Sequence, residues 1–143
     1  MKFIIDHILL IAIVVLSGGA LLWPALTARG KRLSPLEVTQ LINRGKTTIV
    51  DVREPGEFAT GRLQDAKNIP LKELGKRLTE LEKSKNRTII VVCQKGTRAA
   101  VAAAMLNRAG FADVVCLDGG VAEWNKQGLP LVKTAAPVVK LAK

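Results

Sequence analysis

Hydrophobic residues form one long uncharged block near the start of the chain. Residues 8–26 carry no charged side chain, and aliphatic residues fill 8–16 without a break. Because an α-helix rises about 1.5 Å per residue, a block of this length just spans a hydrocarbon core of about 30 Å. The pattern predicts one N-terminal transmembrane helix, with residues 1–28 as an anchor that contacts the membrane through residues 3–26.

The charges that flank this block predict its orientation. Arg29, Lys31 and Arg32 follow it, whereas Lys2 and Asp6 precede it and cancel. Basic residues stay on the cytoplasmic side of a membrane helix, so we expect an inner (plasma) membrane protein with its N-terminus outside and its remaining chain in the cytoplasm. The alternative is a cleaved secretory signal, because residues 18–20 are small, but the basic residues lie on the wrong side of the apolar block for a signal.

Shorter apolar runs alternate with helical patterns through the rest of the chain. A capping box over Ser34–Glu37 opens a helix that Gly45 closes near Arg44. Apolar, β-branched runs predict strands, and helical patterns with glycine at their ends predict helices. The strands are expected over residues 47–52, 88–92 and 113–117, and the helices over residues 54–58, 71–81, 99–109 and 121–127.

Strands separated by helical crossovers predict an α/β fold, a parallel sheet with helices on both faces. Residues 29–131 would form this one domain, and residues 132–143 a mobile basic tail. The apolar side chains expected in its core on the helices are Phe58, Val101, Met105, Leu106 and Trp124.

Cys93 follows the strand predicted at 88–92, just where the next helix is expected to begin. The first N–H groups of a helix lack intrahelical partners and stabilise negative charge placed before the helix. Gly96 permits backbone conformations closed to other residues, and Lys95 and Arg98 add positive charge. We therefore expect a reactive thiolate at the carboxyl end of a strand, where open α/β sheets carry their sites.

The loop from Cys93 to Arg98 has the pattern Cys-x-x-Gly-x-Arg, which resembles the active-site loop of rhodanese-like sulfurtransferases. Further stretches similar to that family occur in the expected order, so that the resemblance covers residues 33–130. They are Asp51–Phe58 with Gly61 and Asn68–Pro70, and Leu117–Gly120 with Trp124 and Gly128–Pro130. The resemblance implies a rhodanese-like parallel sheet flanked by helices, and sulfurtransferase activity.

The residue inventory restricts what Cys93 can do. Cysteine hydrolases need a histidine to activate the thiol and to protonate a leaving group, but residues 29–143 contain none. Cysteine phosphatases have one residue more between cysteine and arginine than this loop has. The distinction between the two families implies that the shorter loop fits a single sulfur better than a phosphoryl group.

Transfer of sulfane sulfur suits a loop without a general base. The thiolate of Cys93 would attack the outer sulfur of a small anionic donor such as thiosulfate, and sulfite would leave without protonation. The N–H groups of residues 94–98 would hold the resulting persulfide until a thiol or cyanide acceptor takes the sulfur in a ping-pong cycle. No metal or organic cofactor is implied.

The predicted site has one covalent carrier, a set of donor-binding residues and a supporting cluster. Cys93 is the nucleophile, and the donor-binding residues are Gln94, Lys95, Gly96, Thr97 and Arg98. Lys95 is either a donor-binding cation or a solvated charge; Arg98 is favoured to shape the loop or hold the anion; Thr97 is a helix cap or a minor hydrogen-bond donor. The family resemblance adds Asp51, Arg53 and Glu57 as a polar cluster, interpreted as a buried ion pair that supports the loop.

Two other functional readings stay open. The domain is alternatively a scaffold or regulatory module that recruits a partner at the membrane with little or no catalysis, since a fold does not fix a function. A thiol redox sensor would require a reachable Cys116, whose apolar surroundings favour a buried small residue instead.

Charge and composition bear on the partners. The chain has a formal net charge of +10, and its first 28 residues carry one charge of each sign, so the excess lies in residues 29–143. Such a surface suits anionic small molecules or an anionic membrane. With three Phe, two Trp, no Tyr and no dense Lys/Arg block, nucleic acid is not an expected partner. Two cysteines without regular spacing exclude a disulfide framework and a four-ligand zinc site.

Overall fold

The computed structural model describes residues 1–27 and 30–133, and places one parallel five-stranded sheet at the centre of the domain. The strands are β1 (Lys31–Leu33), β2 (Thr47–Asp51), β3 (Lys67–Asn68), β4 (Thr88–Val92) and β5 (Val114–Leu117). They lie in the order β1-β5-β4-β2-β3, and every neighbouring pair is parallel. The predicted α/β fold with a parallel sheet is confirmed.

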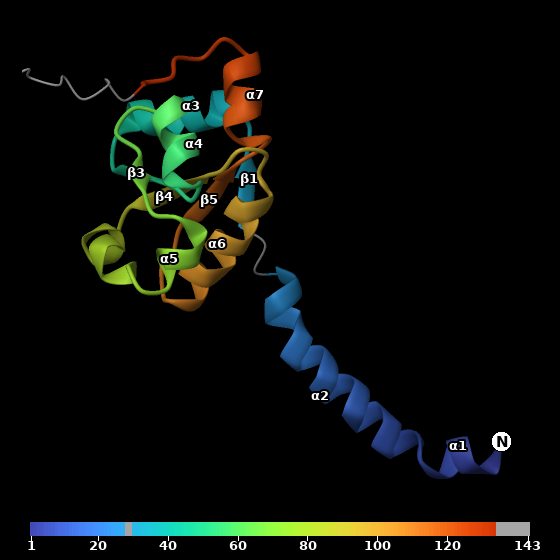
Figure 1. Cartoon of the computed structure of the whole chain (residues 1–143). Coiled ribbons are helices and arrows are strands. Elements are labelled where there is room, and N and C mark those ends of the chain that lie inside the picture. The colour runs from blue at the N-terminus through green and yellow to red at the C-terminus, as the bar shows by residue number, and fades with distance from the viewer. Residues whose placement is uncertain (28–29, 134–143) are drawn as a thin grey trace, which may run out of the picture.

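The helices that follow β1 cover the sheet, whereas α1 and α2 precede β1 and extend away from the domain (Figure 1). The helices are α1 (Lys2–Asp6), α2 (Ile8–Thr27), α3 (Pro35–Arg44), α4 (Pro55–Thr60), α5 (Leu71–Leu74), the 3-10 helix η1 (Leu78–Ser84), α6 (Thr97–Arg108) and α7 (Gly120–Lys126). The predicted start and end of α3 are confirmed: Ser34 and Glu37 form a reciprocal capping box, and Gly45 follows the last turn with a φ of 74°.

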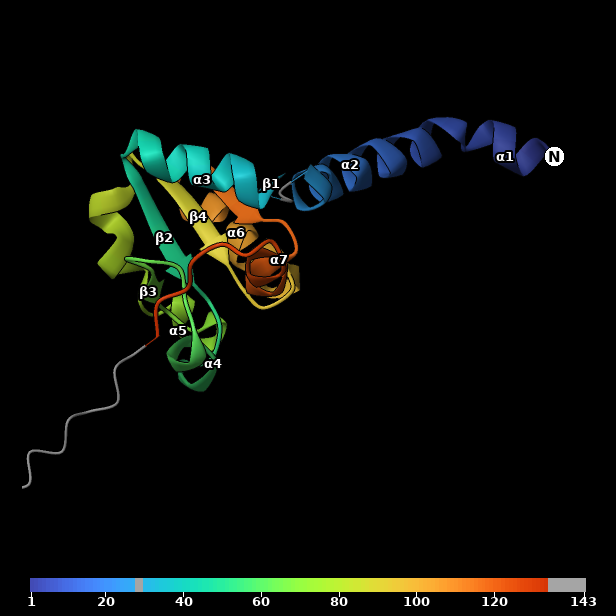
Figure 2. The same cartoon turned by 90° about the horizontal axis from the view of Figure 1, so that it is seen from above.

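Alternation along β4 divides the core into two layers, because successive side chains of a strand point to opposite faces. Ile89 and Val91 pack in the cluster that holds the buried residues of α5, η1 and α6. Ile90 and Val92 pack in the other cluster, which holds those of α3 and α7. Figures 1 and 2 show these helices on the two sides of the sheet. Cys93 continues the alternation and lies on the α6 side.

The helix predicted over residues 71–81 is interrupted. α5 ends at Leu74, and η1 begins only at Leu78. Gly75 follows α5, and glycine disfavours a continuing helix by about 1 kcal/mol relative to alanine. Leu74 and Leu81 are nevertheless both buried in the α6-side core, so the break leaves the apolar pattern satisfied.

Two side chains that the helical pattern placed in the core lie elsewhere. Val101 is 54% exposed, because the face of α6 that meets the sheet is made by other positions. Those positions are Ala99, Ala102, Ala103 and Leu106. Phe58 is half-buried, and its ring stacks under the Arg62 guanidinium at 4.6 Å.

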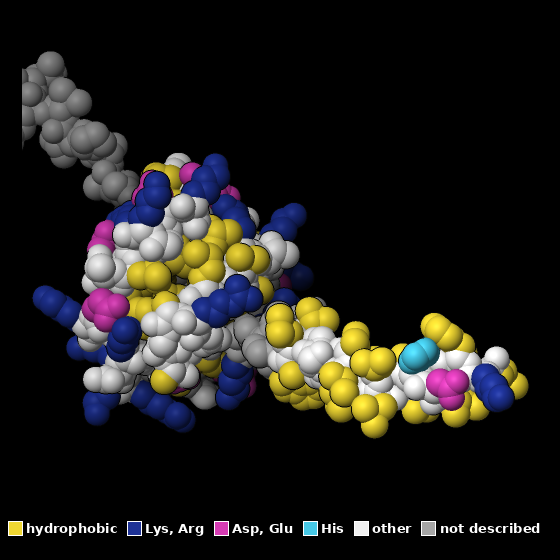
Figure 3. All heavy atoms as spheres, turned by 90° about the horizontal axis from the view of Figure 1, so that it is seen from below, with side chains coloured by type: hydrophobic (Ala, Val, Ile, Leu, Met, Phe, Trp, Pro, Cys, Tyr) yellow, Lys and Arg dark blue, Asp and Glu magenta, His cyan; other side chains and the backbone are white. Residues whose placement is uncertain are grey.

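The ends of the chain bear on the predicted anchor and tail. Nowhere in the described part of the chain does a helix combine the length and apolarity needed to cross a membrane, so the predicted transmembrane helix is not supported. Figure 3 shows hydrophobic side chains along the N-terminal helices and a further group of them on the domain face seen from below. At the other end, Val132 forms an antiparallel bridge with Arg62. The predicted tail beyond it lies, from residue 134 on, outside the described residues.

Candidate active site

The sulfur of Cys93 lies at the carboxyl end of β4 and accepts two backbone hydrogen bonds. The Gly96 N–H donates to Sγ at 2.9 Å and the Ala99 N–H at 3.3 Å. Gly96 has a φ of 102°, a left-handed conformation that favours glycine. Such N–H groups stabilise a sulfur anion without supplying a proton. Gly96 falls within the predicted cradle of residues 94–98. Ala99 lies just outside that range, in the first turn of α6.

A buried ion pair between Asp51 and Arg53 supports the loop that begins at Cys93. Arg53 Nη2 lies 2.7 Å from Asp51 Oδ2, and the two residues are 1% and 0% exposed. The Arg53 guanidinium also donates to the Gln94 side-chain oxygen at 3.3 Å and to the Gly61 carbonyl at 2.6 Å. Arg53 therefore joins the end of β2 to Gln94, the residue after Cys93 in the loop. Its bond to the Gly61 carbonyl has no signal in the sequence, since any residue supplies a carbonyl.

Glu57 lies in α4 and binds Arg98 rather than the Asp51–Arg53 pair. The Arg98 nitrogens Nη1 and Nη2 donate to the two Glu57 oxygens at 2.9 and 3.0 Å, a bidentate geometry. These hydrogen bonds, joined by one from the Glu54 N–H, lower the pKa of Glu57 from 4.5 to about 2, and the same contact raises the pKa of Arg98. Arg98 thus links the first turn of α6 to α4, and its positive charge is paired with the Glu57 carboxylate.

This contact predicts a dependence of stability on pH. Because the pKa of Glu57 is lower in the folded state, the interaction stabilises the fold fully above pH 4.5 and is lost as the pH falls towards 2. Both side chains are about one-third exposed, so we expect a contribution of at most about 1 kcal/mol. Urea unfolding of a Glu57→Gln variant should show a flatter loss of stability with acid across this range than the parent. A matched Glu82→Gln variant, which removes an exposed pair with Lys85, should keep the parental profile; equal profiles for Glu57→Gln and the parent would contradict the assignment.

Two other predicted donor-binding residues lie at the surface. Lys95 is exposed and forms no ion pair with any residue in the described ranges. Thr97 is also exposed and is the first residue of α6, so that Gly96 takes the cap position and no side chain caps the helix. The cap role considered for Thr97 is therefore not seen, and Lys95 is the loop cation left free to meet an anion.

Cys116 is buried beside α6. It is 1% exposed, and its thiol donates to the Ala99 carbonyl at 3.4 Å. Burial raises the pKa of Cys116 to about 11, so the thiol stays protonated near neutral pH. A redox sensor needs this thiol to be reachable and ionisable, and the structure favours neither.

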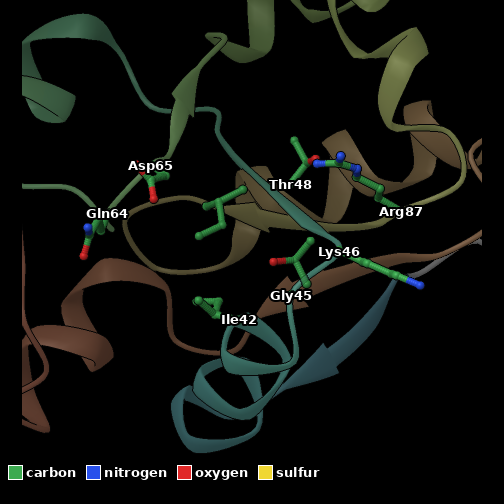
Figure 4. A pocket seen from close by; sticks show the side chains of 9 residues that line it. Ile42, Gly45, Lys46, Thr48, Gln64, Asp65 and Arg87 are labelled. Carbon is green, nitrogen blue, oxygen red and sulfur yellow. The ribbon is translucent and has the colours of Figure 1, made fainter.

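One described cavity is separate from this site. It has a volume of about 390 Å³ and lies around Gly45–Ile49, at the amino end of β2 and thus at the opposite end of the sheet from Cys93. Figure 4 shows Gln64 and Asp65 on one side of it and Thr48 with Arg87 on the other. Within residues 1–27 and 30–133, no three His, Cys, Asp or Glu side chains come together as metal ligands.

Comparison with known proteins identifies the family of the domain. The model of the rhodanese-like domain matches residues 34–127. The chain is 36% identical over 137 residues to the uncharacterized protein YibN of Escherichia coli K12, covering 93% of this chain and 96% of the relative. It is 36% identical over 84 residues to a sulfurtransferase of Allochromatium vinosum, covering 59% and 77%. The solved thiosulfate sulfurtransferase of Pseudomonas aeruginosa superposes with a TM-score of 0.68 at 28% identity, covering 75% of this chain and 21% of that one.

The chain therefore belongs to the rhodanese-like domain family. The matched range of residues 34–127 includes all the strands except β1, and it includes Cys93.

Proposed function

We propose that the protein is a sulfurtransferase that carries sulfane sulfur on Cys93. The donor is a small anion such as thiosulfate, and the acceptor is a thiol or, in an assay, cyanide. The observation that carries this proposal is the pair of N–H groups of Gly96 and Ala99 directed at a cysteine sulfur, in a loop without a histidine.

The reaction needs two displacements at sulfur. In the first, the Cys93 thiolate forms a bond to the outer sulfur of thiosulfate; the S–S bond of thiosulfate breaks, and its electron pair leaves with sulfite. The product is a Cys93 persulfide anion, whose charge the loop N–H groups stabilise. In the second, the acceptor attacks the outer sulfur and the Cys93 thiolate is restored. Neither step needs a general acid, because both leaving groups are stable anions.

Lys95 supplies the charge for donor binding in this proposal. Arg98 is occupied by Glu57, and Arg53 is buried with Asp51, so Lys95 is the loop cation that is exposed to an incoming anion. The Allochromatium relative is a protein named sulfurtransferase, which also supports the proposed reaction class.

The two displacements are tested by the stoichiometry of sulfite release. Thiosulfate added to the full chain without an acceptor should release about one sulfite per protein and then stop, as a ping-pong cycle requires. Cyanide should restart continuous release. Continuous release without any acceptor, or none with cyanide present, would contradict the mechanism.

One observation favours the second candidate, a scaffold or regulatory module with little catalysis. Cys93 is 0% exposed, so a donor reaches the sulfur only when the loop moves. A recruitment module has no need of that access, and the absence of any sulfite release from folded protein would favour it.

We also propose that the N-terminal segment attaches the domain to the inner membrane, with the domain in the cytoplasm. The support is the uncharged stretch of residues 8–26, the exposed apolar side chains on α2 such as Leu9 and Val15, and the cations Lys31 and Arg32 that follow. This attachment is tested on the full chain in cells. It should stay with membranes after alkaline washing, and a C-terminal reporter should be active only in the cytoplasm; release into the wash, or a periplasmic signal, would overturn it.

A further inference from the structure

The amino end of α7 contacts the catalytic loop from the side opposite the sulfur. The Val121 N–H donates to the Cys93 carbonyl at 2.8 Å, and the Ala122 N–H donates to the Gln94 carbonyl at 3.1 Å. Both donors belong to the first turn of a helix, where N–H groups have no partner within the helix. The first two carbonyls of the loop are thus bound by an element about 30 residues away in the chain.

Gly120 makes this contact sterically possible. It has a φ of 63°, and a Cβ on it would collide with the Cys93 carbonyl oxygen and come within 2.6 Å of the Gln94 carbonyl carbon. From the other side, a Cβ on Gly96 would lie 3.6 Å from the Gly119 nitrogen. Two glycine-bearing turns therefore lie directly against each other, backbone to backbone.

These contacts fix the direction of the peptide groups beside the sulfur. In a planar trans peptide the N–H points opposite to the carbonyl, so carbonyls of Cys93 and Gln94 that face α7 direct the following N–H groups away from it. They also keep two partially negative oxygens bound to donors rather than turned towards a sulfur anion. The loop then continues to the N–H groups of Gly96 and Ala99 that reach Sγ.

We propose that the turn from β5 into α7 is the positioning element of the catalytic loop, and that Gly120 is its positioning residue. Gly120 does not touch the reacting atoms; it acts by letting Val121 and Ala122 hold the loop carbonyls. The proposal rests on the proposed function for its kinetic test, but not for its spectroscopic test.

The kinetic test compares Gly120→Ala with Gly128→Ala in the full chain. Gly128 has a similar φ of 73° but nothing within 4 Å of a Cβ, so its variant carries the same kind of backbone strain without the contact. Because a displacement of about 1 Å lowers a rate by about 10²-fold, we expect a loss of that order in kcat for thiosulfate and cyanide in Gly120→Ala. Gly128→Ala should stay within about 3-fold of the parent, well below that displacement effect.

The spectroscopic test follows the ultraviolet absorbance of the Cys93 thiolate as pH is raised. Misplaced N–H groups stabilise the anion less, so Gly120→Ala should show its thiolate signal only at higher pH, whereas Gly128→Ala should match the parent. A merely structural role would lower the melting temperature without moving this titration. The titration needs no turnover, so it still tests the placement of the loop N–H groups if sulfur transfer is not the activity.

A second variant covers the case in which Gly120→Ala does not fold. Ala122→Pro deletes the N–H that binds the Gln94 carbonyl, at an exposed position in the first helical turn, where proline is tolerated. It should shift the thiolate titration and lower kcat in the same direction. The proposal is overturned if folded Gly120→Ala behaves like Gly128→Ala, or if Ala122→Pro keeps both the parental titration and the parental rate.

Discussion

Replacing Cys93 by serine is expected to abolish sulfur transfer while leaving the fold intact. A serine hydroxyl is not ionised near neutral pH, and residues 29–143 contain no histidine to remove its proton. Loss of the nucleophile should therefore lower the initial rate of thiocyanate formation from thiosulfate and cyanide on the order of 10³-fold or more.

Cys116→Ser is the matched control for this experiment. It makes the same sulfur-to-oxygen change at a buried cysteine that hydrogen-bonds the Ala99 carbonyl in α6 and lies outside the loop from Cys93 to Arg98. We expect it to retain transfer within a few-fold of the parent. Transfer that survives in Cys93→Ser, or that disappears equally in both variants while each is folded, would contradict the role of Cys93.

Replacing Asp51 by alanine is expected to have the largest effect on stability. The Arg53 guanidinium would remain buried without its carboxylate, and breaking such a pair costs about 3–5 kcal/mol. Asp118→Ala removes the opposite kind of contact, an exposed 4.0 Å pair with Arg32, and should lose no more than about 1 kcal/mol. Denaturant unfolding of both variants and the parent measures the difference.

A double variant separates the effect of the two charges on stability from the effect of the volume that the two side chains fill. Asp51→Leu together with Arg53→Met replaces both charges with apolar groups, so it should lose less stability than Asp51→Ala alone, because no unpaired charge is left. It should nevertheless impair transfer, since Gln94 loses its partner. Equal stability losses for Asp51→Ala and Asp118→Ala would show that the buried pair is not what supports this part of the fold.

The sequence was most informative where local pattern and tertiary environment agree. β2, β4 and β5 are central strands buried by helices on both faces, and such strands have continuous apolar, β-branched runs. The position of Cys93 follows from β4 and α6 alone. β1 and β3 were not predicted, because edge strands of two or three residues, in which only Leu33 is buried, are too short to show a distinct period.

The contacts that shape the site were harder to predict because they join distant segments. The sequence grouped Glu57 with Asp51 and Arg53, but its partner is Arg98, 41 residues further along. Ala99 contributes a backbone N–H, which every residue except proline possesses, so its identity gives no signal. Gly120 was recognisable as a turn glycine, whereas its contact with the Cys93 carbonyl required the packing of α7 against the loop.

The central claim, that Cys93 carries sulfur, is tested most directly by the intact mass of the full chain after treatment with thiosulfate. The account predicts a gain of one sulfur atom that cyanide removes and that the Cys93→Ser variant does not acquire. An unchanged mass, in folded protein whose Cys93 thiol is free, would contradict it.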